Sequence, residues 1–162
     1  MAAINLDTIL DRLIEREGGY NDDPRDPGGE TKWGISRRFL IRVGLPYEDI
    51  KNMTKERAKD LYLEHFVHEN KLEQFTHSDL LELTLDWIVN GGPAVKALQR
   101  LLNVEVDGVV GPETLKAEAA LTPNRLKELK QQYLYDRMFY FASLTKHPFI
   151  KGWLARLVAL GL

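Results

Sequence analysis

Residues 17–35 read EGGYNDDPRDPGGETKWGI, and this stretch decides how the rest of the chain is interpreted. It is rich in Gly, Pro and Asp, which favour turns and interrupt helices. We expect a long structured loop or a small irregular hairpin over residues 18–34. Loops of this length are uncommon in compact domains and are usually functional, so we expect a functional site in this segment.

Helical periodicity dominates on both sides of this stretch. Before it, apolar residues from Leu6 to Ile14 recur at the spacing of one helix face. A capping box at residues 76–79 is expected to start one of the later helices. Further helices are expected over residues 36–43, 54–70 and 80–89 and from Pro93, Pro112, Pro123 and Pro148. The pattern therefore predicts an all-α protein, in which a large sheet has no place.

Composition excludes several classes of protein. The chain has 162 residues, of which 44% are hydrophobic and 28% charged, as in ordinary globular domains. Lys and Arg total 22 against 24 for Asp and Glu, so the net charge of −2 argues against a nucleic-acid partner. The chain has no cysteine, which excludes disulfides, thiolate metal sites and a cysteine nucleophile.

No segment has the features of a membrane span or a secretory signal. No apolar run reaches the roughly 18 residues that a span needs. Residues 1–16 are amphipathic and charged, without the basic start and apolar core of a signal peptide. Residues 149–162 could be read as a membrane-active amphipathic helix, but we expect them to pack on the helical core. Stable membrane insertion is not expected.

Glu17 is the most informative single residue. At 100° per residue it projects into the apolar stripe that runs from Ile9 to Ile14, and it lies at the negative end of the helix dipole. Both effects favour a protonated carboxyl, as a general acid requires. The alternative is a Glu that turns out to solvent as the helix frays. A buried acid beside a loop of exposed carboxylates is typical of glycoside hydrolases. The alternatives for the loop are a cluster of turn-forming residues and a calcium-binding loop.

At the level of whole motifs the chain resembles a known family. The E-G-G-Y start, the D-P-x-D-P-G-G-x-T continuation and the W-G-I ending look like the phage and bacterial N-acetylmuramidases of glycoside hydrolase family 108. Residues 94–99 and 106–114 resemble the peptidoglycan-binding region usual in that family. We expect a catalytic region over residues 1–90 and a peptidoglycan-binding-like helical lobe over residues 91–162, together forming one cooperative body.

The resemblance implies a lysozyme-like helical fold and hydrolysis of the β-1,4 bond between N-acetylmuramic acid and N-acetylglucosamine. It assigns the acid to Glu17, the base to Asp26 and the positioning of a water to Thr31, with an inverting outcome. Phage lysozymes have eight residues between Glu and Asp and five between Asp and Thr. Here eight residues separate Glu17 from Asp26 but four separate Asp26 from Thr31, so Asp22 and Asp23 remain rival bases.

Five further residues are candidates for binding substrate. Aromatic faces pack on pyranose rings, which singles out Tyr20, Trp33 and Tyr62; core packing is the alternative, and the better interpretation for Trp33. Asp86 and Asn90 share the polar face of an apolar helix, where they would hydrogen-bond sugar groups or simply be solvated.

Four other polar residues are assigned no role in binding substrate. His65, His68 and His77 do not form a metal-binding motif, so neither a metal nor a cofactor is expected. Arg137 lies within the apolar stripe of the long helix and requires a buried anionic partner, for which Glu17 or another cleft carboxylate is proposed.

These features predict a monomeric phage endolysin that acts on peptidoglycan glycan strands. The protein would accumulate in the host cytoplasm and reach the wall through a separate membrane pore. Two rival functions remain: a lytic transglycosylase that uses Glu17 alone, and a non-catalytic module that binds the wall or is associated with secretion.

Overall fold

The computed structural model describes residues 4–22, 29–46, 49–144, 155 and 158–161. The chain divides into two compact units, Asn5–Glu69 and Asn70–Leu162, the second of which includes Met1–Ile4. Within the described residues the only sheet has two short strands, so the all-α class is confirmed. None of the helices seen in these ranges is long and apolar enough to cross a membrane.

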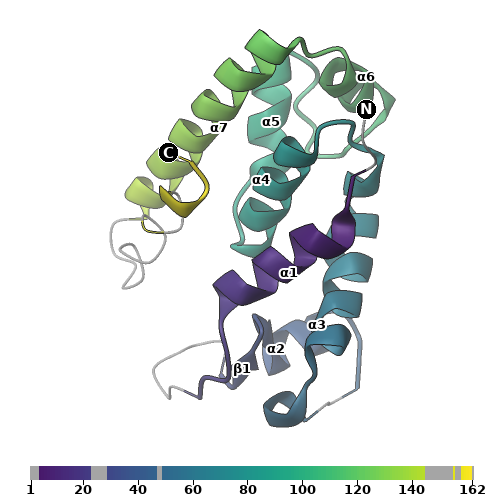
Figure 1. Cartoon of the computed structure of the whole chain (residues 1–162), viewed down its shortest axis with the longest axis vertical. Coiled ribbons are helices and arrows are strands. Elements are labelled where there is room, and N and C mark those ends of the chain that lie inside the picture. Colours follow the sequence, from purple (N-terminus) through teal and green to yellow (C-terminus); the bar gives the residue numbers. More distant parts are fainter. Residues whose placement is uncertain (1–3, 23–28, 47–48, 145–154, 156–157, 162) are drawn as a thin grey trace. The chain divides into compact units, whose positions relative to one another are not determined.

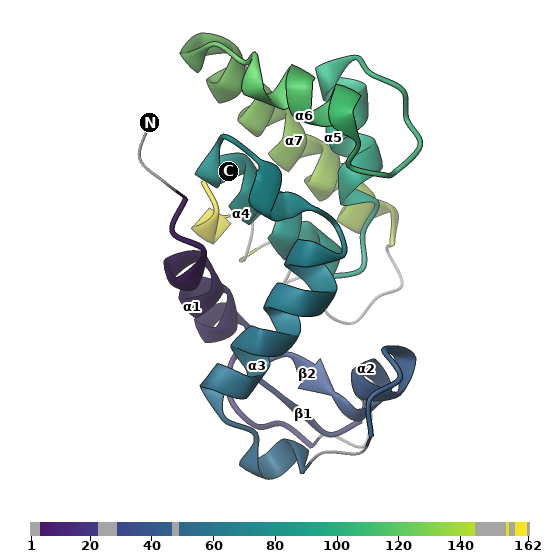
Figure 2. The same ribbon diagram turned by 90° about the vertical axis from the view of Figure 1, so that its right-hand side faces the viewer.

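The first unit begins with helix α1 (Leu6–Glu17), which Asn5 caps by accepting a hydrogen bond from the Thr8 N–H at 3.0 Å. The residues that α1 buries are those of the expected stripe: Ile9, Leu10, Leu13 and Ile14. Helix α3 (Lys55–Tyr62) packs beside α1, as Figure 2 shows. On the surface of this pair, Lys59 binds both Asp7 and Asp11 of α1, at 2.7 and 2.6 Å.

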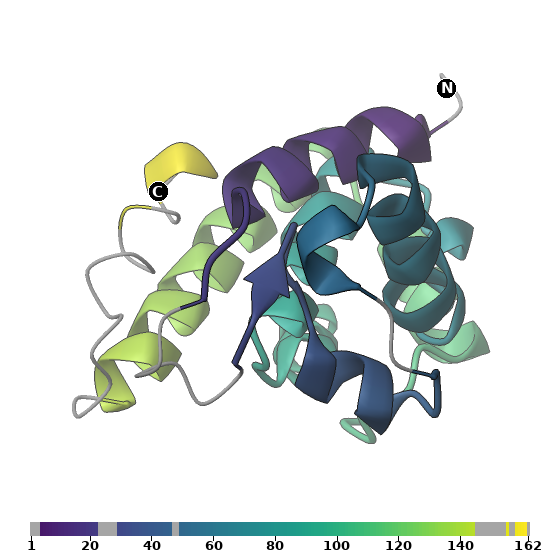
Figure 3. The same ribbon diagram turned by 90° about the horizontal axis from the view of Figure 1, so that it is seen from below.

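A tight hairpin follows the loop after α1. Strands β1 (Thr31–Lys32) and β2 (Ile35–Ser36) pair antiparallel, with Thr31 opposite Ser36. Trp33 and Gly34 form the hairpin turn, and their φ angles of 53° and 76° are those of a type I′ turn, which requires positive φ at both positions. The strands lead into α2 (Arg37–Arg42), as Figure 3 shows. The Ser36 hydroxyl caps this helix by accepting a hydrogen bond from the Phe39 N–H at 3.1 Å. The expected small hairpin is therefore present.

The rest of this unit supports the hairpin. The short 3-10 helix η1 (Ile50–Asn52) contacts β1. Thr54 caps α3 as expected, accepting from the Arg57 N–H at 3.1 Å. The helix then continues as a π-helix, η2 (Leu63–His68), a form that is rare and often found near functional sites.

The second unit is a helical assembly around α5. In it α5 packs against α4, α6 and α7, and η3 packs against α4 (Figure 1). The elements are η3 (Leu72–Gln74), α4 (Ser78–Val89), α5 (Ala94–Leu102), α6 (Pro112–Ala119) and α7 (Pro123–Ser143). Pro112 and Pro123 begin their helices as expected, and Thr122 caps α7. The helix expected from Pro148, with its packing on the core, falls largely outside the described residues.

The expected capping box at residues 76–79 is wrong. Helix α4 begins at Ser78 with His77 at the N-cap position, and no side-chain cap is formed there. Instead the buried carboxylate of Glu118, from α6, accepts hydrogen bonds from the backbone N–H groups of Thr76 and His77 at 2.9 and 2.8 Å. The backbone N–H groups just before α4 therefore find their acceptor in a side chain of another helix, where a capping box would have used local side chains.

A buried ion pair joins α4 and α7. Arg137 donates to an Asp86 carboxylate oxygen at 2.6 Å, and the two side chains are 1% and 0% exposed. The expectation that Arg137 has a buried anionic partner is confirmed, and that partner is Asp86.

Candidate functional site

Glu17 is the last residue of α1, about one turn beyond the buried Leu13 and Ile14 of the apolar stripe. Its side chain is half-buried, so the placement agrees with its projection toward the apolar face. Gly18 ends the helix with φ of 81°, its N–H donating to the Ile14 carbonyl at 3.2 Å. The chain turns away at this glycine, which leaves the Glu17 carboxyl at the start of the loop.

The hairpin turn lies directly against Glu17. A Cβ added to Gly34 would stand 2.8 Å from Glu17 Cγ and 2.1 Å from the Tyr62 hydroxyl oxygen. Both distances are shorter than real side chains allow, and Gly34 has a positive φ. Only glycine fits this position, because it lets backbone approach the stem of Glu17. The sequence signal for this position is the W-G-I motif, in which Gly34 was not a candidate site residue.

Trp33 anchors the same turn. Its backbone N–H donates to the Gly18 carbonyl at 3.1 Å, and its indole N–H donates to the Met53 carbonyl at 3.3 Å. The ring is half-buried, with Lys55 Nζ 5.1 Å from its centre. These contacts give Trp33 a packing role, the interpretation that the sequence favoured over contact with sugar.

Tyr62 is fully buried, with 0% of its surface exposed. Its hydroxyl donates to the Trp33 carbonyl at 3.0 Å, and its ring packs on Phe66 with centroids 5.3 Å apart. This placement lends no support to a role for Tyr62 in lining a sugar cleft.

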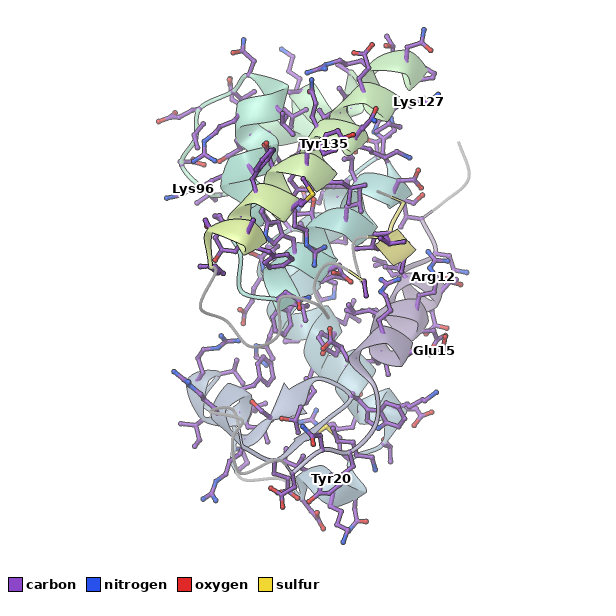
Figure 4. The ribbon with its side chains drawn as sticks, turned by 90° about the vertical axis from the view of Figure 1, so that its left-hand side faces the viewer. Arg12, Glu15, Tyr20, Lys96, Lys127 and Tyr135 are labelled. Atoms are coloured by element: carbon purple, nitrogen blue, oxygen red, sulfur yellow. The ribbon has the colours of Figure 1, made fainter. Side chains whose placement is uncertain are left out.

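Tyr20 is the exposed aromatic of the loop, at 41% exposure; Figure 4 labels it. Its hydroxyl donates to Glu30 at 2.8 Å, and this hydrogen bond, with the nearby negative charge of Glu30 and Asp22, raises the pKa of Tyr20 to about 12. The hydroxyl therefore stays protonated in the physiological range, and the ring retains an accessible surface.

Thr31 lies in β1, half-buried, and its hydroxyl donates to the Gly29 carbonyl at 3.0 Å. Its backbone exchanges two hydrogen bonds of 2.8 Å with Asn21, which ties the start of the loop to the hairpin. Of the three candidate bases, Asp22 is exposed, whereas Asp23 and Asp26 lie outside the described residues.

The remaining predicted residues belong to the second unit or take part in local pairs. The Asp86 carboxylate forms an ion pair with Arg137. At the end of α4, the Asn90 side-chain amide donates to the backbone carbonyl of Asp86 at 2.7 Å. Neither placement supports contact with substrate. Among the residues that the structure describes, no group of three or more His, Asp or Glu side chains could hold a metal ion.

The chain is similar to known proteins in both sequence and fold. Residues 10–92 match the model of a family described as "Glycosyl hydrolase 108", and residues 93–158 match one described as "Predicted Peptidoglycan domain". The solved structure of Brucella abortus SagA is similar, with 30% sequence identity and a TM-score of 0.74 over 96% of this chain and 90% of that one. No curated protein matches the chain.

Proposed function

We propose that this chain, which belongs to the glycosyl hydrolase 108 family, cleaves the β-1,4 bond between N-acetylmuramic acid and N-acetylglucosamine. At the coarser level the chain is a glycoside hydrolase that acts on peptidoglycan. The observation that carries the finer proposal is the position of Glu17, a half-buried residue at a helix end, with the backbone of a tight turn packed against its Cβ and Cγ.

In the proposed mechanism Glu17 donates its proton to the glycosidic oxygen as the bond to the anomeric carbon breaks. A water on the opposite face of the sugar forms the new bond to the anomeric carbon, while Asp26 accepts a proton from that water and Thr31 orients it. This is a single displacement from the face opposite the leaving group, so the configuration at the anomeric carbon inverts. The Thr31 hydroxyl already gives its hydrogen to the Gly29 carbonyl, so it would meet the water as an acceptor.

The second region is the proposed binding site for the glycan strands. We propose that residues 91–162 form a binding lobe that holds these strands while the first region cuts them, and the match to a peptidoglycan domain supports this division. We further propose that the protein is a monomeric phage endolysin that accumulates in the host cytoplasm and reaches the wall through a separate pore. The loop motif, which resembles that of phage and bacterial N-acetylmuramidases, supports the endolysin part of this proposal.

Glu17→Gln tests the proposal. The amide keeps the shape of the side chain but has no proton to give, and loss of a general acid typically costs ~10²–10⁴-fold in rate. Clearing of chloroform-treated Gram-negative cells should therefore cease. Glu15→Gln is the matched control, because Glu15 is exposed on the same helix (Figure 4). A Glu17→Gln protein that clears cells at the wild-type rate would remove Glu17 from the mechanism.

Product analysis separates hydrolysis from the rival transglycosylase reaction. Mass spectrometry of digested peptidoglycan should find reducing muramic acid ends, whereas a transglycosylase would leave anhydro ends. Asp26→Asn should also abolish hydrolysis. If Asp22→Asn or Asp23→Asn is the inactivating change instead, the base lies earlier in the loop.

A further inference from the structure

The proposed acid occupies a position that needs support from outside its own helix. Glu17 is the final residue of α1, and the last turn of a helix frays easily. A general acid must nevertheless be held in a defined geometry, because small misplacements of reacting groups slow catalysis steeply. The contacts that restrain Glu17 are therefore part of the catalytic apparatus, even where they do not touch substrate.

The first restraint is the hairpin turn. Gly34 offers bare backbone to the side chain, so the stem of Glu17 lies close enough that a Cβ at residue 34 would meet both its Cβ and its Cγ, at 3.1 and 2.8 Å. A turn in this position limits the rotamers that Glu17 can adopt, provided that the turn itself does not move.

The second restraint is what holds the turn in place. Trp33 precedes Gly34, and its carbonyl accepts the hydrogen bond from the Tyr62 hydroxyl at 3.0 Å. Tyr62 is at the end of α3, is wholly buried and packs on Phe66, so it is a fixed point. A Cβ at residue 34 would stand 2.1 Å from this hydroxyl oxygen and 2.8 Å from Glu17 Cγ, so Tyr62 and Glu17 both lie against Gly34.

From these contacts, and resting on the proposed function, we infer that Tyr62 is a positioning residue for the general acid. Its hydroxyl anchors the Trp33 carbonyl, the anchored turn presses Gly34 against Glu17, and the carboxyl is thereby held in one orientation. Tyr62 itself is buried and does not contact substrate, so it acts on the rate of the chemical step and leaves substrate binding unchanged.

Tyr62→Phe tests this role, since it keeps the ring and removes the hydroxyl. We expect kcat on purified peptidoglycan to fall roughly 10-fold, on the scale of one buried hydrogen bond, while KM is unchanged. Tyr133→Phe is the matched control: Tyr133 is buried in the second unit and donates to the Ala94 carbonyl at 3.0 Å. It should lower the melting temperature at least as much as Tyr62→Phe without the loss of kcat.

Gly34→Ala tests the same contact without altering Tyr62. The added methyl group would collide with the Tyr62 oxygen and with Glu17, so kcat should fall and KM should again be unchanged. In the double variant the oxygen 2.1 Å from that methyl group is absent, so Tyr62→Phe should cost less on the Gly34→Ala background than on the wild type.

The outcomes separate the two proposals. If the wild-type protein does not cleave peptidoglycan, the proposed function fails. If it does, and Tyr62→Phe keeps wild-type kcat, or loses kcat only in proportion to a loss of stability that Tyr133→Phe shares, the positioning role of Tyr62 is overturned. Additive losses of kcat in the double variant would overturn it as well.

Discussion

Arg137 and Asp86 are the residues at which a single substitution should matter most for stability. Each brings a charge into a nearly inaccessible site, and each is tolerated there because the other is 2.6 Å away. Tyr133 and Trp87 pack nearby in the same core, with ring centroids 5.1 Å apart. The pair therefore joins α4 to α7, and removing one member takes a buried countercharge away from the other.

Arg137→Met should destabilise the protein by about 3–5 kcal/mol, because Asp86 would lose the partner of its buried charge. The double variant Arg137→Met/Asp86→Leu should recover much of that loss, since an apolar pair needs no compensation. Urea unfolding of both variants measures this. A single variant as stable as the wild type would show that the ion pair contributes little to holding the helices together.

At the scale of elements, the loop between α5 and α6 shows how one side chain can organise a turn. Buried Gln99 of α5 donates to Asp107 at 2.7 Å and to the Val109 carbonyl at 3.0 Å, and accepts from the Gly108 N–H at 2.8 Å. Asp107 in turn accepts from the Val109 N–H at 2.8 Å. The loop is thus tied to the helix at several atoms.

The Asp107 carboxylate makes this loop sensitive to acid. Hydrogen bonds from the Val109 N–H and, secondarily, from Gln99 hold the pKa of Asp107 below its usual value. A lowered pKa in the folded state means that the charged form stabilises the fold above the unfolded-state pKa of ~3.9 and that this contribution is lost as the pH falls below it. Asp107→Asn should therefore flatten the dependence of melting temperature on pH in that acidic range. An unchanged slope would contradict the assignment.

Element boundaries show where local sequence was sufficient and where it was not. Helix starts capped from within the same few residues, such as those at Ser36 and Thr54, were predictable because donor and acceptor are close in the chain. The start of α4 was not predictable, because the backbone N–H of Thr76, just before it, donates to Glu118, which is 42 positions away in the chain. The change from α3 to the π-helix η2 was likewise not predicted by the spacing of the apolar residues.

At the scale of the whole molecule, the boundaries of the family matches and of the compact units differ. The two matches meet between residues 92 and 93, whereas the units meet between Glu69 and Asn70. The difference is residues 70–92, which include η3 and α4: they lie within the first match, but in the structure η3 packs on α4 and α4 packs on α5 in the second unit. Fold and sequence family thus divide the chain at different points.

This difference leads to a prediction about fragments. A fragment of residues 93–162 lacks α4, so Arg137 would have no Asp86 and the core would lose Trp87. It should be unfolded by circular dichroism, whereas a fragment of residues 70–162 should retain helix and melt cooperatively. A stably folded 93–162 fragment would show that α4 is dispensable to the second unit. Calorimetry of the full chain would test whether the whole melts as one cooperative body, as the sequence predicts.

Local sequence patterns predicted the helical class, the small hairpin after the first helix and the projection of Glu17 toward an apolar face. These follow from periodicity and from turn-forming residues, which act over a few positions. Contacts between distant residues settle which residue pairs with Arg137, which carboxylate accepts from the backbone N–H groups before α4, and that Tyr62 faces the hairpin turn in place of an open cleft. Those contacts join residues 51, 42 and 29 positions apart, and no local pattern encodes which distant partner folding will bring together.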